Sequence, residues 1–132
     1  MPKNALPAQD LPVCEETHQH SQAYDSMMDD MPSDDAFIES ATIFSQLSDS
    51  TRLKILYLLC HNSVCVCNIA DAIGISAPAV SHHLRSLKLL GLLDFKRVGK
   101  EVYYTLADNE DGRLIHKMID DMFGRSCMID VR

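Results

Sequence analysis

Long apolar runs are absent from this chain of 132 residues, and none approaches the roughly 20 residues that a membrane-spanning helix needs. The N-terminus also lacks the basic segment followed by an apolar one that marks a secretory signal. Neither a membrane protein nor an exported protein is therefore expected. The sequence predicts a soluble protein of the cytoplasm.

The sequence also lacks the pattern typical of a disulfide framework, because it has an odd number of cysteines, five, and no secretory signal. Disulfide frameworks belong mainly to exported chains with even numbers of cysteines, so we expect reduced thiols. A chain of this length with 46% hydrophobic residues can bury one modest core. One folded domain is predicted, and dimerisation would enlarge its core.

Charge is unevenly distributed along the chain. The net charge is −7, but residues 50–107 contain three acidic and seven basic residues, whereas residues 1–49 contain ten acidic residues and one basic residue. Attraction to phosphate groups depends on the local field more than on the total charge of the chain. The acidic total therefore does not exclude DNA, and it suggests that the N-terminal segment lies away from it.

Two short helices joined by a turn are predicted over residues 69–93, in IADAIGISAPAVSHHLRSLKLLGLL. Gly74 can adopt the left-handed conformation that ends a helix, and Ser76 can cap the next helix. An apolar stripe with helical spacing is expected to face the domain, formed by Val80, Leu84 and Leu87. The opposite face, with Pro78, His82 and Arg85, has short polar and basic groups that suit a major groove.

A β-hairpin is predicted directly after Gly91, in LLDFKRVGKEVYYTL, because the segment is rich in β-branched and aromatic residues and is interrupted at Gly99. Its tip is basic and suits phosphates or a minor groove. An ordinary helical hairpin would also leave a polar face in solvent, but the order of elements favours a winged helix-turn-helix. The candidate DNA-binding residues are Ser76, Ala77, Ser81, His82, Arg85, Lys88, Lys96, Arg97 and Lys100.

Residues 47–108 resemble the ArsR/SmtB family of metal-sensing winged-helix repressors. The resemblance rests on several motifs in the family's order, namely DSTRLKIL, the CVC motif at Cys65 to Cys67, IADAIGIS, SHHLRSLK, GLL and the hairpin ending in YYTL. It implies a mainly α fold with a β-hairpin wing. It also implies a homodimeric bacterial repressor that releases its operator DNA when metal binds.

The CVC motif is the main candidate metal site. Cys65 and Cys67 are expected at the start of a helix, where backbone N–H groups favour the thiolate that binds metal. Two thiolates alone make a poor site, and Cys14, His18 and His20 could complete it from the N-terminal arm. Chance enrichment of such residues in a polar tail is the simpler alternative for the arm alone. The resemblance supports a joint site, since one family sensor site joins a CVC pair to an N-terminal arm.

Such a thiolate-rich site prefers Cd²⁺, Pb²⁺ or Zn²⁺ over hard cations. The arsenic-sensing branch of the family has a third cysteine where this chain has Ala70. This departure disfavours an arsenite- or antimonite-responsive repressor, although Cys14 could supply the third sulfur. A thiol redox or persulfide switch remains an alternative for the same cysteines. Cys60 is expected to be a small buried residue, and Cys127 has no assigned role.

A helix over residues 110–124 is predicted to bury its apolar side against a second copy of the chain. Its apolar residues are Leu114, Ile115, Met118, Ile119, Met122 and Phe123. The resemblance implies that this helix can carry a second metal site, but the family's ligand pattern is not matched here. The residues at or near those positions are Asp108, Glu110, His116 and Asp121. His116 and Asp120, one helical turn apart, could form a weak metal site, but a solvated histidine beside a carboxylate is the more common arrangement.

These patterns predict three segments. Residues 1–33 form a mobile, proline-containing arm with metal ligands, residues 34–124 form the DNA-binding and dimerisation domain, and residues 125–132 form a tail. The first helix of the domain is expected to place Phe37, Ala41 and Phe44 on one side. A cysteine–histidine enzyme built on Cys14 is disfavoured, because a mobile arm lacks the fixed geometry that catalysis needs.

Overall fold

The computed structural model describes residues 11–16, 19 and 21–124 of the chain. The chain divides into two compact units, Met1–Asp34 and Asp35–Arg132. In the first unit, the helix α1 spans Gln22–Asp29, and the side chain of Ser21 caps it by accepting a hydrogen bond from the Tyr24 N–H at 3.2 Å. The sequence analysis did not predict this helix, because its residues are all exposed and show no sustained apolar period.

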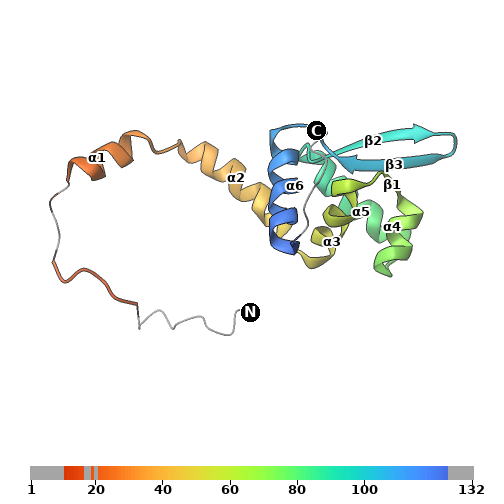
Figure 1. Ribbon diagram of the computed structural model, residues 1–132, viewed down its shortest axis with the longest axis horizontal. Helices are drawn as coiled ribbons and strands as arrows, with labels where there is room; N and C mark the ends of the chain where they lie inside the picture. Colours follow the sequence, from red (N-terminus) through yellow and green to blue (C-terminus); the bar gives the residue numbers. More distant parts are fainter. Residues whose placement is uncertain (1–10, 17–18, 20, 125–132) are drawn as a thin grey trace. The chain divides into compact units, whose positions relative to one another are not determined.

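The second unit is mainly helical with one small sheet, as predicted (Figure 1). Its elements are α2 (Asp34–Leu47, which begins at the last residue of the first unit), α3 (Ser50–His61), β1 (Val64–Cys65), α4 (Val66–Ile73), α5 (Ala77–Leu89), β2 (Leu93–Val98), β3 (Glu101–Leu106) and α6 (Glu110–Phe123). Among the described residues, no helix is both long and apolar enough to cross a bilayer.

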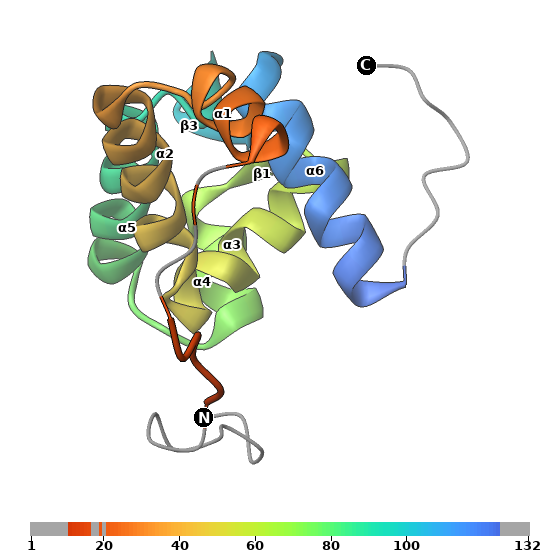
Figure 2. The same cartoon turned by 90° about the vertical axis from the view of Figure 1, so that its left-hand side faces the viewer.

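Helix α3 lies at the centre of the second unit (Figure 2). The Asp49 side chain caps it by accepting a hydrogen bond from the Arg52 N–H at 3.2 Å. The Arg52 guanidinium also donates to the carbonyl of Gln46 at 2.9 Å. This bond fastens the end of α2 to the start of α3.

The turn between α4 and α5 has the predicted chemistry. Gly74 has a φ of 81° in the left-handed region, and its N–H donates to the carbonyl of Ala70 at 2.8 Å. Ser76 then caps α5 by accepting a hydrogen bond from the Ala79 N–H at 3.3 Å. The helix-turn-helix is therefore formed by local signals that the sequence carries.

The hairpin of β2 and β3 is also present, and β1 adds a third strand that the sequence analysis missed. All pairs are antiparallel and the strand order is β1-β3-β2, with Cys65 opposite Tyr103. Leu106 at the base of the hairpin is buried, whereas Val102 and Tyr104 are only half-buried. The buried part of the hairpin is thus confined to its base, because the tip extends beyond the helices (Figure 1).

The core lies between α3, α4, α5, the base of the hairpin and α6. Its buried residues are Ile55, Leu56, Leu59, Cys60, Ile69, Val80, Leu84, Leu87, Leu92, Leu93, Leu106, Ile115 and Ile119. The predicted stripe of α5 is fully within this set. Cys60 is fully buried, as expected. Leu53 is only half-buried and packs against the edge of the core.

The outer apolar surfaces of α2 and α6 are not covered within the described part of the chain. On α2, Phe37 is 47% exposed and Phe44 is 58% exposed, while Ile43 and Leu47 contact the core instead. On α6, Ile115 and Ile119 are buried, but Leu114 and Met122 are each 62% exposed. The apolar residues of α6 therefore divide between an inward stripe and an outward one.

Candidate nucleic-acid interface and metal ligands

Helix α5 presents a short polar and basic surface opposite its buried stripe. Ser81, His82 and Arg85 are exposed, while Val80 and Leu84 on the other side are buried. At the N-terminal end, Ser76 is exposed and Ala77 is half-buried. Because the exposed groups are short or carry hydrogen-bond donors, a groove of DNA can approach this face closely.

Lys88 joins this surface to the hairpin. Its ammonium group lies 3.7 Å from the centre of the Phe95 ring, which is a cation–π contact between α5 and β2. The Phe95 ring in turn lies 6.0 Å from the Tyr104 ring on β3. Lys88 is expected near DNA from the sequence, but Phe95 is not singled out, because an aromatic residue on a predicted strand is common. In the structure Phe95 is 51% exposed to solvent.

The hairpin tip is basic and exposed. Lys96 and Arg97 on β2 and Lys100 in the turn are all exposed, and Gly99 supplies the positive φ of 63° that the turn requires. The Tyr103 hydroxyl donates a hydrogen bond to the Glu101 carboxylate. This bond, with the adjacent negative charge, raises the pKa of Tyr103 above its ordinary value.

The CVC motif lies where the helix-turn-helix meets the sheet. Cys65 is both the last residue of β1 and the N-terminal cap position of α4, and it is only 8% exposed. Cys67 lies in the first turn of α4 and is exposed. The predicted position at a helix start is confirmed, and the pairing of Cys65 with Tyr103 of β3 adds a link to the wing.

The remaining sulfur and nitrogen ligands predicted for this site are in the N-terminal arm. Cys14 belongs to the first unit and is exposed. His18 and His20 lie outside the described residues, and so does Cys127 in the C-terminal tail.

The four residues considered for a second metal site on the terminal helix, all of which the structure describes, do not form a group of neighbouring ligand atoms within one chain. Asp108 pairs with Arg113 at 3.1 Å, and Asp121 pairs with Lys117 at 2.7 Å. The hydrogen bond to Asp121 raises the pKa of Lys117. Glu110 is exposed at the first turn of α6.

His116 instead belongs to a different group of side chains. It approaches Asp120 on its own helix and His61 at the end of α3. Among the described residues, His61, His116 and Asp120 are the one set of three or more histidine, cysteine or acidic side chains whose ligand atoms lie within 4.8 Å of one another. No local pattern in the sequence connects His61 with Asp120, which lies 59 positions away, so the approach of His61 is a feature that only the structure shows.

Comparison with known proteins gives a consistent result. The model of the family described as "Bacterial regulatory protein, arsR family" matches residues 49–94. A protein of Synechocystis named as a homologue of the transcriptional repressor SmtB is 34% identical over 114 residues, which cover 86% of each chain. A Staphylococcus aureus homologue of the cadmium resistance regulatory protein CadC is 38% identical over 106 residues, or 80% of this chain and 87% of that protein.

The fold is also similar to solved structures. One is the homodimeric winged helix-turn-helix DNA-binding domain of Mb0332 from Mycobacterium bovis, with a TM-score of 0.57 and 26% identity. That match covers 82% of this chain and 91% of the solved one.

Proposed function

Because the chain belongs to the ArsR family of bacterial regulatory proteins, we propose that it is a metal-responsive transcriptional repressor. As a homodimer it binds palindromic operator DNA, and it releases the operator when a soft or borderline metal ion binds. The observation that carries this proposal is the place of Cys65, which begins the helix-turn-helix and pairs with the wing strand β3.

The dimer reads DNA with two copies of α5. The exposed groups Ser81, His82 and Arg85 contact base edges in the major groove, and Lys88 with the hairpin tip contacts phosphates. Two successive major grooves on one side of a duplex are about 34 Å apart, which sets the spacing of the two half-sites. The local excess of basic residues over residues 50–107 supplies the attraction to the DNA backbone.

The outward apolar residues of α2 and α6 support the dimer. A pocket lined by Phe44, Leu47, Leu114 and Met118, among others, shows that these two helices form one surface. Single chains rarely leave apolar patches of this kind in water. A second copy of the chain covers this surface in our proposal, which places the two recognition helices on one face of the DNA.

The metal is held by thiolates of Cys65 and Cys67 together with Cys14, and by His18 or His20 as a nitrogen ligand. Two cysteines at one helix start, one of them exposed, fit the donor chemistry of Cd²⁺, Pb²⁺ or Zn²⁺. Cys14, Cys65 and Cys67 would hold such an ion with their thiolates, and the ion would link the N-terminal arm to the start of α4. Ala70 stands three positions after the CVC motif, where the arsenic-sensing branch of the family has a cysteine ligand. A response to arsenite is therefore disfavoured.

Coupling to DNA follows from what Cys65 touches. A shift of Cys65 moves the start of α4, whose end leads through Gly74 into α5, and it also moves β1 against β3. Both DNA-contacting elements are therefore displaced together. Thermodynamic linkage requires the effect to be reciprocal, so operator DNA weakens metal binding by the same factor.

The test is a fluorescence anisotropy titration with a duplex that the protein has selected from a random pool. Adding Cd²⁺, Pb²⁺ or Zn²⁺ is expected to weaken operator binding at least tenfold in the wild type. The double variant Cys65→Ser with Cys67→Ser keeps operator affinity but loses the metal effect, while Cys127→Ser serves as the matched control. Unchanged DNA affinity with every metal rejects the sensor, and release by oxidant alone supports a thiol switch instead.

A further inference from the structure

A buried polar cluster joins the end of α3 to α6, away from the cysteines. His61 Nε2 lies 2.8 Å from one oxygen of the Asp120 carboxylate, and His116 Nε2 lies 3.1 Å from the other oxygen. The two imidazole rings are 4.6 Å apart and nearly perpendicular, at 88°. Three potential metal donors thus converge from two helices of the same chain.

The cluster is largely closed to solvent. The side chains of His61, His116 and Asp120 are 19%, 13% and 9% exposed, respectively. Burial of a carboxylate is costly unless it is paired, and Asp120 is the one buried charged residue among those that the structure describes. A hydrogen-bonded pair of one histidine with Asp120 would meet that need. The second imidazole, which approaches the other carboxylate oxygen, is more than this pairing requires.

The spacing suits a metal ion with few adjustments. Ligands about 2.0–2.1 Å from a tetrahedral Zn²⁺ lie about 3.3 Å from one another. The two nitrogen–oxygen distances, 2.8 Å and 3.1 Å, each run to a different oxygen of the Asp120 carboxylate and are about 0.2–0.5 Å shorter than that spacing. One ligand atom of each side chain lies within 4.8 Å of the other two. Rotation of the two rings and of the carboxylate would be needed to bring both nitrogens and one oxygen onto a common ion.

We propose that His61, His116 and Asp120 form a second metal site within one chain, which binds a borderline divalent cation of the Zn²⁺ class. Two imidazole nitrogens and one carboxylate oxygen are ligands that Zn²⁺, Co²⁺ and Ni²⁺ accept, whereas Cd²⁺ and Pb²⁺ are better served by thiolates. The slight exposure of the cluster leaves room for water as a fourth ligand. The site therefore differs from the CVC motif in the cation that it selects.

The location gives the bound ion a structural consequence. His61 is the last residue of α3, and only Asn62, Ser63 and Val64 separate it from Cys65. An ion at this site fixes the end of α3 to α6, the helix whose outer face we assign to the dimer. Zn²⁺ bound there thus holds the segment that leads into the CVC motif, while the thiolates remain available.

The test uses the full chain with Cys14→Ser, Cys65→Ser and Cys67→Ser, which removes the thiolate site. Calorimetric titration with Zn²⁺ is expected to give one ion per chain, and Co²⁺ is expected to give a tetrahedral absorption spectrum without a thiolate band. His61→Gln, His116→Gln and Asp120→Asn, each added separately, weaken Zn²⁺ binding at least tenfold. The matched control is His83→Gln, a half-buried histidine 3.9 Å from Asp49, which leaves binding unchanged.

A second measurement, of the Tm, distinguishes loss of Zn²⁺ binding from poor folding of a variant. A hundredfold excess of Zn²⁺ over its Kd should raise the Tm of the triple serine variant by roughly 5 °C or more. Asp120→Asn, which preserves the size of the side chain, should lose this rise. No Zn²⁺ binding by the triple serine variant overturns the proposal, as does equal binding or an equal rise in Tm in all variants derived from it. Since neither readout involves DNA or thiolates, the outcome is independent of the repressor proposal.

Discussion

At the scale of single residues, Arg85 is the residue that we expect to contribute most to DNA recognition in the proposed function. It is exposed on α5 between His82 and Lys88, and its guanidinium can donate two hydrogen bonds to a guanine edge. Neighbouring residues contribute through other chemistry, because Lys88 is already held against the Phe95 ring. Arg85 therefore has the strongest expected effect on sequence preference.

Replacing Arg85 by alanine is expected to weaken binding to the selected operator by roughly tenfold to a hundredfold, since one base-contacting pair is lost. The preference at one base pair of each half-site should relax at the same time. Fluorescence anisotropy with the selected duplex and with a duplex changed at that base pair measures both effects. Lys54→Ala, which removes an exposed cation from α3, is the control, and an equal loss in that variant would refute a specific role for Arg85.

At the scale of elements, the start of α6 depends on close approach between two backbone segments. The Asn109 side chain caps the helix through the Gly112 N–H at 2.8 Å and also donates to the Gly91 carbonyl at 2.9 Å. A Cβ on Gly112 would lie 1.9 Å from the Ala107 carbonyl oxygen. The absence of a side chain at Gly112 lets α6 begin against the end of β3.

Gly112→Ala is accordingly expected to lower the free energy of unfolding by about 1–3 kcal/mol, because backbone atoms must move to relieve the contact. Urea unfolding followed by circular dichroism gives the difference directly. Arg113→Ala, at the next position and on the surface, should change stability by less than about 1 kcal/mol. A variant at Gly112 as stable as the wild type would show that the approach of Ala107 is not required.

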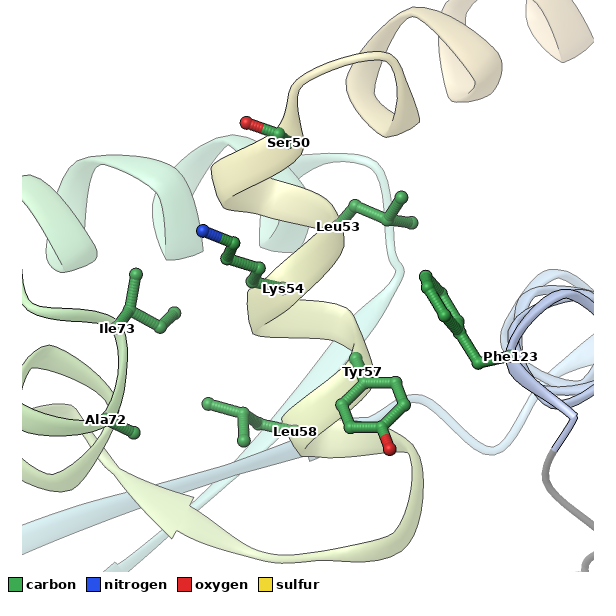
Figure 3. Close-up of a pocket in the computed structure, with 8 residues that line it drawn as sticks. All are labelled: Ser50, Leu53, Lys54, Tyr57, Leu58, Ala72, Ile73 and Phe123. Carbon is green, nitrogen blue, oxygen red and sulfur yellow. The ribbon is translucent and has the colours of Figure 1, made fainter.

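A second feature at this scale is the groove between α3, α4 and α6. It has a volume of ≈ 630 Å³ and is mostly apolar, with Leu53, Tyr57 and Phe123 among its lining residues (Figure 3). The Phe123 ring meets the Tyr57 ring edge to face, with the ring centres 5.4 Å apart. The last turn of α6 is thereby kept beside α3, on the same helix pair that carries His61 and His116.

At the scale of the whole molecule, the proposed function requires two chains acting together. One recognition helix contacts only a half-site, and a palindromic operator requires the second helix at a fixed distance. The outward apolar stripes of α2 and α6 are the surfaces available for that association. Loss of the dimer should therefore reduce DNA binding without altering α5.

Leu114→Glu places a charge on the outward stripe of α6 and is expected to convert the dimer to monomer at micromolar concentration, since an unpaired charge would have to be buried. Analytical ultracentrifugation measures the change, and operator affinity should fall at least tenfold. Ser48→Glu, an exposed position between α2 and α3, is the charge-matched control. A dimer that persists in Leu114→Glu would place the interface elsewhere.

The sequence by itself determined the parts of this protein that depend on local chemistry. Gly74 and Ser76 specify the turn between α4 and α5, the spacing of Val80, Leu84 and Leu87 specifies the buried side of α5, and Gly99 specifies the hairpin turn. The position of Cys65 at a helix start follows from the same signals. Each of these features is set within a few residues, so no knowledge of distant segments is needed.

Tertiary structure alone decided how distant segments meet. The two-residue strand β1 exists because β3 offers it an edge, and its own sequence has no strand period. The inward stripe of α6 could not be separated from the outward one until α3 fixed which residues face the core. His61 joins His116 and Asp120 for the same reason, because chain folding brings it to a pair that lies 59 positions or nearly as many away in the sequence.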